Sequence, residues 1–296
     1  MKTTYRMMGV ADFITLANGL LGVAAILFII LAVEELQNPY FEDGVNTNYI
    51  WGAMTCILLS VIGDIIDGPV ARKYSKRKIL GGTLDVMSDC ISFCVAPALL
   101  IFVMFGRWGE AAPIWTISLG IAACWVIVTG MLRLARFQYE EASDKPYFHG
   151  LASPANAMVL ITAAAMIWLQ PNAGFGPEVS SNSLFDIFDS SSPVEKPYFD
   201  FLILPIMLIS GGLMIADRKL PKNKHGLPFK ISSIQGLAIL SATIISLINS
   251  TEFGIDLGNT KPQFILYSIS AILLLFYIVT GPMQSELQEI QSNESE

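Results

Sequence analysis

The stretch ITLANGLLGVAAILFIILAV, residues 14–33, decides the class of fold. It carries no charged side chain, and at 1.5 Å per residue a helix of this length crosses the roughly 30 Å hydrocarbon core of a bilayer. The stretch PQFILYSISAILLLFYIVTG at residues 262–281 has the same character. Only 15% of the residues are charged, against about a quarter in soluble domains. We therefore predict an all-α polytopic membrane protein, with residues 14–33 as a retained span and not a signal peptide.

Working outward from this stretch, the chain contains eight apolar segments that we predict to be transmembrane helices. They form a single integral membrane domain over residues 1–296. The predicted spans are about 12–33, 49–71, 82–105, 113–135, 153–170, 199–216, 233–250 and 263–282. The longest connection, 171–198, is read as an outer loop and 283–296 as a polar tail.

Basic residues are distributed unequally between the two sides of the predicted bundle. Fifteen Lys and Arg fall in the N-terminus and in the loops 72–78, 133–145 and 218–230, whereas three fall on the opposite side. Because basic loops stay in the cytoplasm, we expect both termini there and the protein in the cell membrane. The net charge of −7 comes mainly from the acidic outer loops and implies nothing about nucleic acid. Because the sequence shows no basic, aromatic-interleaved surface, we expect no nucleic-acid partner.

Four aspartates interrupt the second and third predicted spans. They occur in VIGDIIDGPVARKYSKRKILGGTLDVMSDC, residues 61–90, as Asp64, Asp67, Asp85 and Asp89. Residues three or four apart share a helix face, and a short loop makes the two helices antiparallel neighbours. The sequence therefore predicts that the two pairs of carboxylates meet near the cytoplasmic ends of the helices.

Such a cluster needs positive charge, because a charged side chain at bilayer depth costs at least ~2.5 kcal/mol. Oxygen ligands without His or Cys favour a hard divalent cation such as Mg²⁺, Mn²⁺ or Ca²⁺, and two such ions would clamp a phosphate. Residues snorkelling at the membrane interface, or an ion relay in a transporter, are the alternatives. Snorkelling suits the basic loop at 72–78 but not the short, deep aspartates.

Glycines accompany the aspartates at the places where a ligand would approach the backbone. Gly68 follows Asp67, and Gly81 and Gly82 open the third span. A glycine admits close approach, and a helix start offers free N–H groups to a phosphate. We interpret these glycines as a seat for a nucleotide diphosphate, whereas Gly19 and Gly22 are expected to serve helix packing.

The pattern Asp64-x2-Asp67-Gly68-x2-Ala71-Arg72-x8-Gly81-x3-Asp85-x3-Asp89 resembles the signature of the CDP-alcohol phosphatidyltransferase family at every fixed position. The stretches ITLANGLLG, SFCVAPA, RLARFQ and YFHGLASPANA are similar to its phosphatidylserine synthase branch, although Cys94 and Ala152 depart from it. The resemblance covers about residues 10–170, which would be the catalytic region, with 199–282 as additional helices. It implies a six-helix core and a homodimer.

The resemblance also implies an activity: transfer of the phosphatidyl or archaetidyl group of a CDP-lipid to the hydroxyl of L-serine, with release of CMP. It implies two Mg²⁺ or Mn²⁺ ions and Asp89 as general base. Arg133 and Arg136, at the cytoplasmic end of the fourth predicted span, are either ordinary positive-inside anchors or, as we hypothesise for one of them, the ligand of the acceptor carboxylate. The residues implied to hold metal are Asp64, Asp67, Asp85 and Asp89; those implied to bind CDP-lipid are Asn18, Gly68, Ala71, Arg72 and Gly81.

Two alternatives stay open on the sequence. The acceptor could instead be glycerol 3-phosphate, inositol phosphate or another alcohol. An ion-coupled transporter would use two corresponding halves, but the sequence shows no second Asp-rich copy after residue 150.

Overall fold

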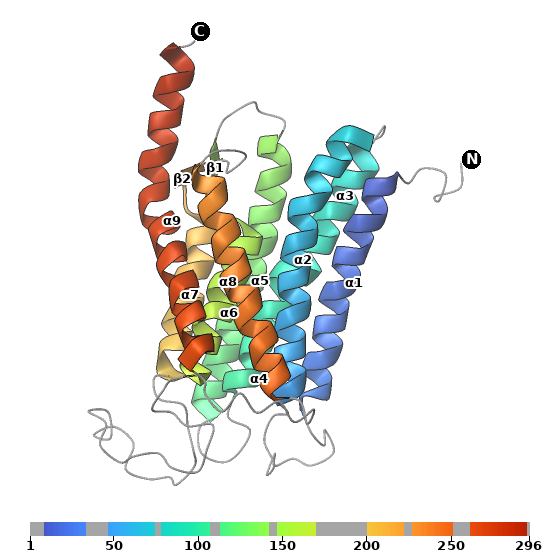
Figure 1. Cartoon of the computed structure of the whole chain (residues 1–296), viewed down its shortest axis with the longest axis vertical. Coiled ribbons are helices and arrows are strands. Elements are labelled where there is room, and N and C mark those ends of the chain that lie inside the picture. The colour runs from blue at the N-terminus through green and yellow to red at the C-terminus, as the bar shows by residue number, and fades with distance from the viewer. Residues whose placement is uncertain are drawn as a thin grey trace.

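The computed structural model describes residues 9–33, 47–74, 78–106, 113–141, 147–169, 200–221, 227–250 and 261–294. Within this part the chain forms one bundle of roughly parallel helical rods (Figure 1). The helices are α1 (Val10–Leu31), α2 (Thr47–Tyr74), α3 (Lys78–Asp89), α4 (Ala96–Phe105), α5 (Pro113–Glu141), α6 (Ser153–Trp168), α7 (Ile203–Ile215), α8 (Leu227–Ser250) and α9 (Lys261–Glu294). A 3₁₀ turn, Asp200–Leu202, precedes α7.

The outer surface of the bundle is apolar, as a bilayer requires. Leu20, Ile114 and Val279 are 68%, 79% and 68% exposed, which water would penalise and lipid would not. Among the described residues, five helices are long and apolar enough to cross a membrane, whereas three of the predicted spans correspond to shorter apolar helices, Ser153–Trp168, Asp200–Ile215 and Ser233–Ile248. The prediction of a helical, polytopic membrane protein is confirmed.

All eight predicted spans are helical, but three helices continue beyond the predicted ends. α2 runs to Tyr74, α5 to Glu141, and α9 passes through Pro282 to Glu294, so that the polar tail is largely helical. Their apolar windows stop earlier, at Ile66, Gln138 and Met283. Hydropathy locates the part of a helix that suits lipid, while helix-forming polar residues extend the same helix into water. The outer loop at 171–198 lies outside the described residues.

The start of α1, the end of α2, the start of α3 and the end of α9 lie at the same end of the bundle (Figure 1). We call it the carboxylate end, because Asp64, Asp85 and Asp89 lie toward it. An even number of spans, such as the predicted eight, would bring the start of α1 and the end of α9 to one end in this way.

The third predicted span is not a uniform α-helix. Between α3 and α4 the residues Cys90–Val95 form a π-helical segment, in which the Ala96 N–H bonds the Ile91 carbonyl five residues back. Pro97 supplies the physical reason, because it has no N–H to give to the Phe93 carbonyl and its ring crowds that carbonyl. The widened turn follows directly after Asp89.

Two three-residue strands, which an all-α prediction omits, tie two connections together at the carboxylate end. β1 (Tyr147–His149) pairs antiparallel with β2 (Lys219–Pro221), and Phe148 lies opposite Leu220. Gly150 then adopts φ 75°, and a Cβ at this position would collide with the Met214 carbonyl. Only glycine combines that backbone conformation with that contact. This turn fixes the start of α6.

Candidate active site

Three carboxylates from two helices meet at the carboxylate end. Asp64 of α2 and Asp85 and Asp89 of α3 each offer an oxygen, and these oxygens lie within 4.8 Å of one another. All three residues are half-buried. The four-residue spacing puts Asp85 and Asp89 on one face of α3, and α1, which packs against both α2 and α3, holds Asp64 of the antiparallel α2 close to them. The predicted meeting of the two helices is thus present for these three residues.

Four further predicted residues belong to the same helix, α2, but their side chains lie outside the described part of the structure. They are Asp67, Gly68, Ala71 and Arg72. Their backbone is helical. Their predicted roles stay predictions.

The described carboxylates fit a hard divalent cation. Ligand oxygens around Mg²⁺ at about 2.1 Å stand up to ~4.2 Å apart, and around Ca²⁺ at about 2.5 Å up to ~5 Å apart. The three carboxylate oxygens lie within 4.8 Å of one another, which is near the upper end of this range. Small side-chain movements would therefore bring all three carboxylates around one ion. Without a cation, three negative charges would repel one another in a poorly solvated place. The donor set is all oxygen, the set that such ions prefer.

Helix α1 holds α3 in register through a series of short contacts. The Ser88 hydroxyl donates to the Thr15 carbonyl at 2.9 Å, and the Ser92 hydroxyl donates to the Asn18 carbonyl at 2.9 Å. A Cβ on Gly22 would collide with Ser92, including its Cα at 2.8 Å. The predicted packing role of Gly22 is therefore confirmed, and a similar close contact joins Gly19 to Ser88. These contacts fix the depth of Asp85 and Asp89.

Asn18, a predicted CDP-lipid ligand, lies between α1, α2 and the π-helical segment. It is 4% exposed, and the Ser60 hydroxyl of α2 also donates to its carbonyl at 3.2 Å. The glycine at position 63 gives the Asn18 amide its space, because a Cβ there would collide with it. Asn18 of α1 thus joins α2 to the π-helical segment that follows α3.

Asp12 is a buried carboxylate of this region that the sequence reasoning missed. It is 3% exposed, accepts a hydrogen bond from the Gly9 N–H at 2.7 Å, and its Oδ1 lies 2.8 Å from where a Cβ of Gly81 would be. Gly81 therefore leaves space for Asp12 at the first turn of α3, where a negative charge is favourable. The available signal was an acidic residue in the first turn of α1, typical of a capping arrangement.

Arg133 and Arg136, the two predicted acceptor ligands, have different surroundings. Arg133 is 3% exposed, and its guanidinium lies 5.4 Å from the Phe137 ring centre and 5.8 Å from that of Phe148. Arg136 forms an ion pair with Asp217 at 2.7 Å, and Asp217 is 85% exposed. From the sequence alone, neither arginine could be preferred as the acceptor ligand. In the structure Arg133 is buried, whereas Arg136 forms an ion pair at the surface.

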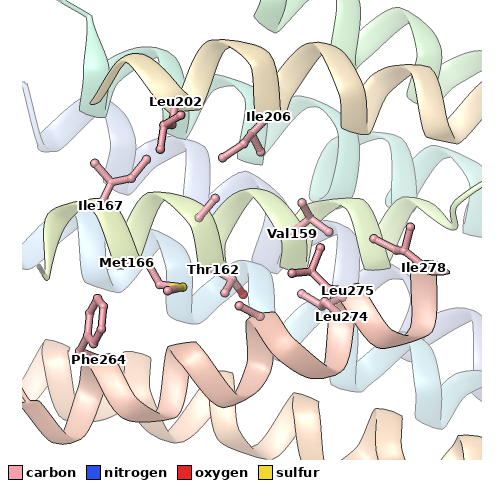
Figure 2. A pocket seen from close by; sticks show the side chains of 12 residues that line it. Val159, Thr162, Met166, Ile167, Leu202, Ile206, Phe264, Leu274, Leu275 and Ile278 are labelled. Carbon is pink, nitrogen blue, oxygen red and sulfur yellow. The ribbon is translucent and has the colours of Figure 1, made fainter. Parts of the chain in front are cut away.

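An apolar cavity of about 440 Å³ opens between α6, α7 and α9. Figure 2 shows Val159 and Met166 of α6 facing Leu274 and Ile278 of α9 across it, with Thr162 contributing an oxygen. The Thr162 hydroxyl lies 3.5 Å from that of Ser270 and shares a hydrogen bond with it. Such a lining suits hydrocarbon and not a charged acceptor, which must be bound elsewhere.

The fold and the carboxylate cluster together define an integral membrane protein with an oxygen-donor site at one end of its bundle. A family model described as CDP-alcohol phosphatidyltransferase matches residues 8–189, more than half of the chain. The chain belongs to this family of enzymes. The match includes the three carboxylates, Arg133 and Arg136, and the resemblance inferred from the aspartate pattern is confirmed.

The chain is also similar to individual proteins of this family. The CDP-diacylglycerol–serine O-phosphatidyltransferase of Saccharomyces cerevisiae is 28% identical over 225 residues, 73% of this chain and 72% of that protein. A protein of the same name from Methanocaldococcus jannaschii is 31% identical over 158 residues, 53% of this chain and 61% of the relative. The archaetidylserine synthase of Methanothermobacter thermautotrophicus is 36% identical over 110 residues, 36% and 44% of the two chains. The last two matches span less than two thirds of those relatives.

Proposed function

We propose that this chain transfers the phosphatidyl or archaetidyl group of a CDP-lipid to the hydroxyl of L-serine and releases CMP. The observation that carries the proposal is the cluster of Asp64, Asp85 and Asp89 in a member of this family. The names of the relatives favour serine as the acceptor.

The metal ligands in this proposal are Asp64, Asp67, Asp85 and Asp89. Bound Mg²⁺ or Mn²⁺, as one or two ions, would neutralise the diphosphate and stabilise charge on the leaving CMP. The spacing of the three described carboxylates and their all-oxygen chemistry support this assignment.

Asp89 acts as the general base. A serine hydroxyl is a weak nucleophile, and a carboxylate within hydrogen-bond reach takes its proton as the oxygen attacks. The oxygen bonds to the lipid-bearing phosphorus while the bond from that phosphorus to the bridging oxygen breaks. CMP leaves with the bridging oxygen, and the proton resides on Asp89 until it passes to water.

The residues that hold the CDP group lie in the last turns of α2 and the first turn of α3. Arg72 pairs with a phosphate oxygen, and Gly68, Ala71 and Gly81 give the diphosphate and cytidine access to the backbone. Asn18 supports the seat from α1. The lipid chains remain in the bilayer.

Arg133 binds the acceptor carboxylate, with Arg136 as the second candidate. A buried guanidinium beside two aromatic rings is weakly hydrated and suits a carboxylate. The exposed ion pair of Arg136 makes that residue the less favoured of the two. The carboxylate end faces the cytoplasm, where serine and CTP-derived substrates are found, and the protein is a homodimer.

A panel of acceptors tests the proposal. Purified protein receives CDP-lipid and Mn²⁺ or Mg²⁺, with L-serine, glycerol 3-phosphate or inositol phosphate in separate reactions, and CMP is measured. Serine is expected to give the fastest release. Release with another alcohol but not with serine would keep the reaction type and replace the acceptor, while no release with any alcohol would refute the proposal.

A further inference from the structure

Two polar side chains at the start of α6 are buried away from solvent. Asn156 is 0% exposed and Ser153 is 2% exposed. Neither the amide oxygen nor the amide nitrogen of Asn156 has a hydrogen-bond partner among the described residues, and the Ser153 hydroxyl has only the weakly hydrogen-bonding Cys94 thiol beside it. Buried polar groups are nearly always paired, because an unmade hydrogen bond in the interior is destabilising. Ser153 and Asn156 are three positions apart and therefore lie on one helix face.

Ser153 lies beside the helical run that continues from Asp89, and this run packs against α5, which carries Arg133. The Ser153 hydroxyl neighbours the Cys94 thiol, which is five residues beyond Asp89 in the same helical run. The Cys94 sulfur in turn packs against Gly130 of α5, 2.5 Å from where a Cβ of that glycine would lie. Gly130 is less than one helical turn from Arg133. These contacts connect Ser153 to the helices that carry Asp89 and Arg133, the two residues proposed to bind the acceptor.

A second connection leads from Arg133 to the same place. Its guanidinium lies against the Phe148 ring, and Phe148 precedes Ser153 by five residues through the tight turn at Gly150. Pro154, in the first turn, favours the beginning of α6 at this point. The position of the pair relative to Arg133 is therefore set by a strand, a constrained glycine and a helix start.

The chemistry of the pair complements the one acceptor group that has no assigned partner. L-Serine offers a carboxylate, which Arg133 binds, a hydroxyl, which Asp89 deprotonates, and an ammonium. An ammonium has three donors and needs oxygen acceptors, which the Asn156 amide and the Ser153 hydroxyl supply. We propose that Asn156 and Ser153 bind the ammonium group of the acceptor and so select an amino acid over other alcohols. This inference rests on the proposed function.

Substrate analogues and variants test the proposal together. L-Serine is compared with 3-hydroxypropionate, which lacks only the amino group, as an acceptor or, where turnover is slow, as a competitive inhibitor. In Asn156→Leu and Ser153→Ala the KM for serine is expected to rise about 10- to 100-fold, the size expected for hydrogen bonds to a charged group. The constant for 3-hydroxypropionate should stay within about twofold, because that molecule makes no such bond.

Thr162→Val is the matched control, since Thr162 is a buried polar residue of α6 that faces the apolar cavity. It should leave both constants unchanged. Thermal unfolding of each variant checks folding, and Asn156→Leu should unfold at the same temperature as the wild type or higher, because it removes an unpaired buried amide. If Asn156→Leu does not fold, Ser153→Ala, which removes a single oxygen atom, decides the question.

Two results would overturn the proposal. One is an unchanged KM for serine in folded variants; the other is an equal loss for serine and 3-hydroxypropionate, which would mean a structural role. Failure of the proposed function is distinguishable, since the wild type would then release no CMP with serine.

Discussion

At the scale of single residues, the carboxylates were the most predictable part of the site. The spacings of Asp64, Asp85 and Asp89 follow from helix periodicity, and two antiparallel neighbours bring them together. Asp12 and Asn156 were not predictable in this way, because their significance arises from contacts made by α1 and α6 with distant helices. Periodicity reports the face of a helix on which a residue lies, and not the partner that the face meets.

Substitution of Asp89 tests the proposed base. Asp89→Asn is expected to lower kcat with serine by about 10²- to 10⁴-fold, because the amide cannot take the proton. CMP release under saturating CDP-lipid and Mn²⁺ measures the effect. Asp200→Asn, at the opposite end of the bundle, is the control. An unchanged rate in Asp89→Asn would contradict the assignment.

Arg133→Lys tests the acceptor's carboxylate contact. An ammonium cannot reproduce the planar two-donor arrangement of a guanidinium, so the KM for serine should increase about 10-fold or more with a smaller change in kcat. Arg218→Lys, an exposed basic residue at the same end, should behave as the wild type. A serine KM that is the same in Arg133→Lys and the wild type would argue for Arg136 instead.

At the scale of elements, the contact of α1 with the α3–α4 run controls the position of the carboxylates. The sequence predicted tight packing at Gly22 but not the π-helical segment that begins just after Asp89. A single proline is compatible with a kink, a break or a widened turn, and the neighbours decide among them. The strands β1 and β2 could not be predicted either, because a strand of three residues is too short to show the two-residue alternation of apolar and polar side chains.

Gly22→Ala tests that contact. The added Cβ would collide with backbone atoms of Ser92, at 2.8 Å and 3.0 Å, so that neither helix can relieve it by a side-chain rotation. We expect a loss of about 1–3 kcal/mol of stability and a lower activity. Gly236→Ala in α8, where a Cβ meets no atom within 4 Å, should be neutral or slightly stabilising. Thermal unfolding in detergent compares them, and equal behaviour of the two variants would contradict the packing argument.

At the scale of the whole molecule, composition and hydropathy predicted the class of fold well. Each of the eight predicted apolar stretches is helical, the third being divided into α3, the π-helical segment and α4, and the start of α1 and the end of α9 lie at the same end of the bundle (Figure 1). Hydropathy could not predict the cavity between α6, α7 and α9, because it depends on how far the helices diverge, and apolar residues line both packed and open helix faces.

Cysteine labelling tests the arrangement across the membrane. The four native cysteines all lie within spanning helices. Single cysteines are introduced by Asp217→Cys, Glu294→Cys and Asp200→Cys, and sealed vesicles of known orientation are treated with an impermeant maleimide. The first two should react from the cytoplasmic side and the third from the opposite side. Reaction of Asp217→Cys and Glu294→Cys from different sides would contradict the topology.

The most direct test of the central claim measures both products of one reaction. Purified protein is given CDP-lipid, labelled L-serine and Mn²⁺ or Mg²⁺, and CMP and the serine-containing lipid are quantified. We predict that the two appear in equal amounts, that a chelator stops both, and that added metal restores both. Formation of CMP without a serine-containing lipid, or undiminished formation of both under chelation, would contradict the account.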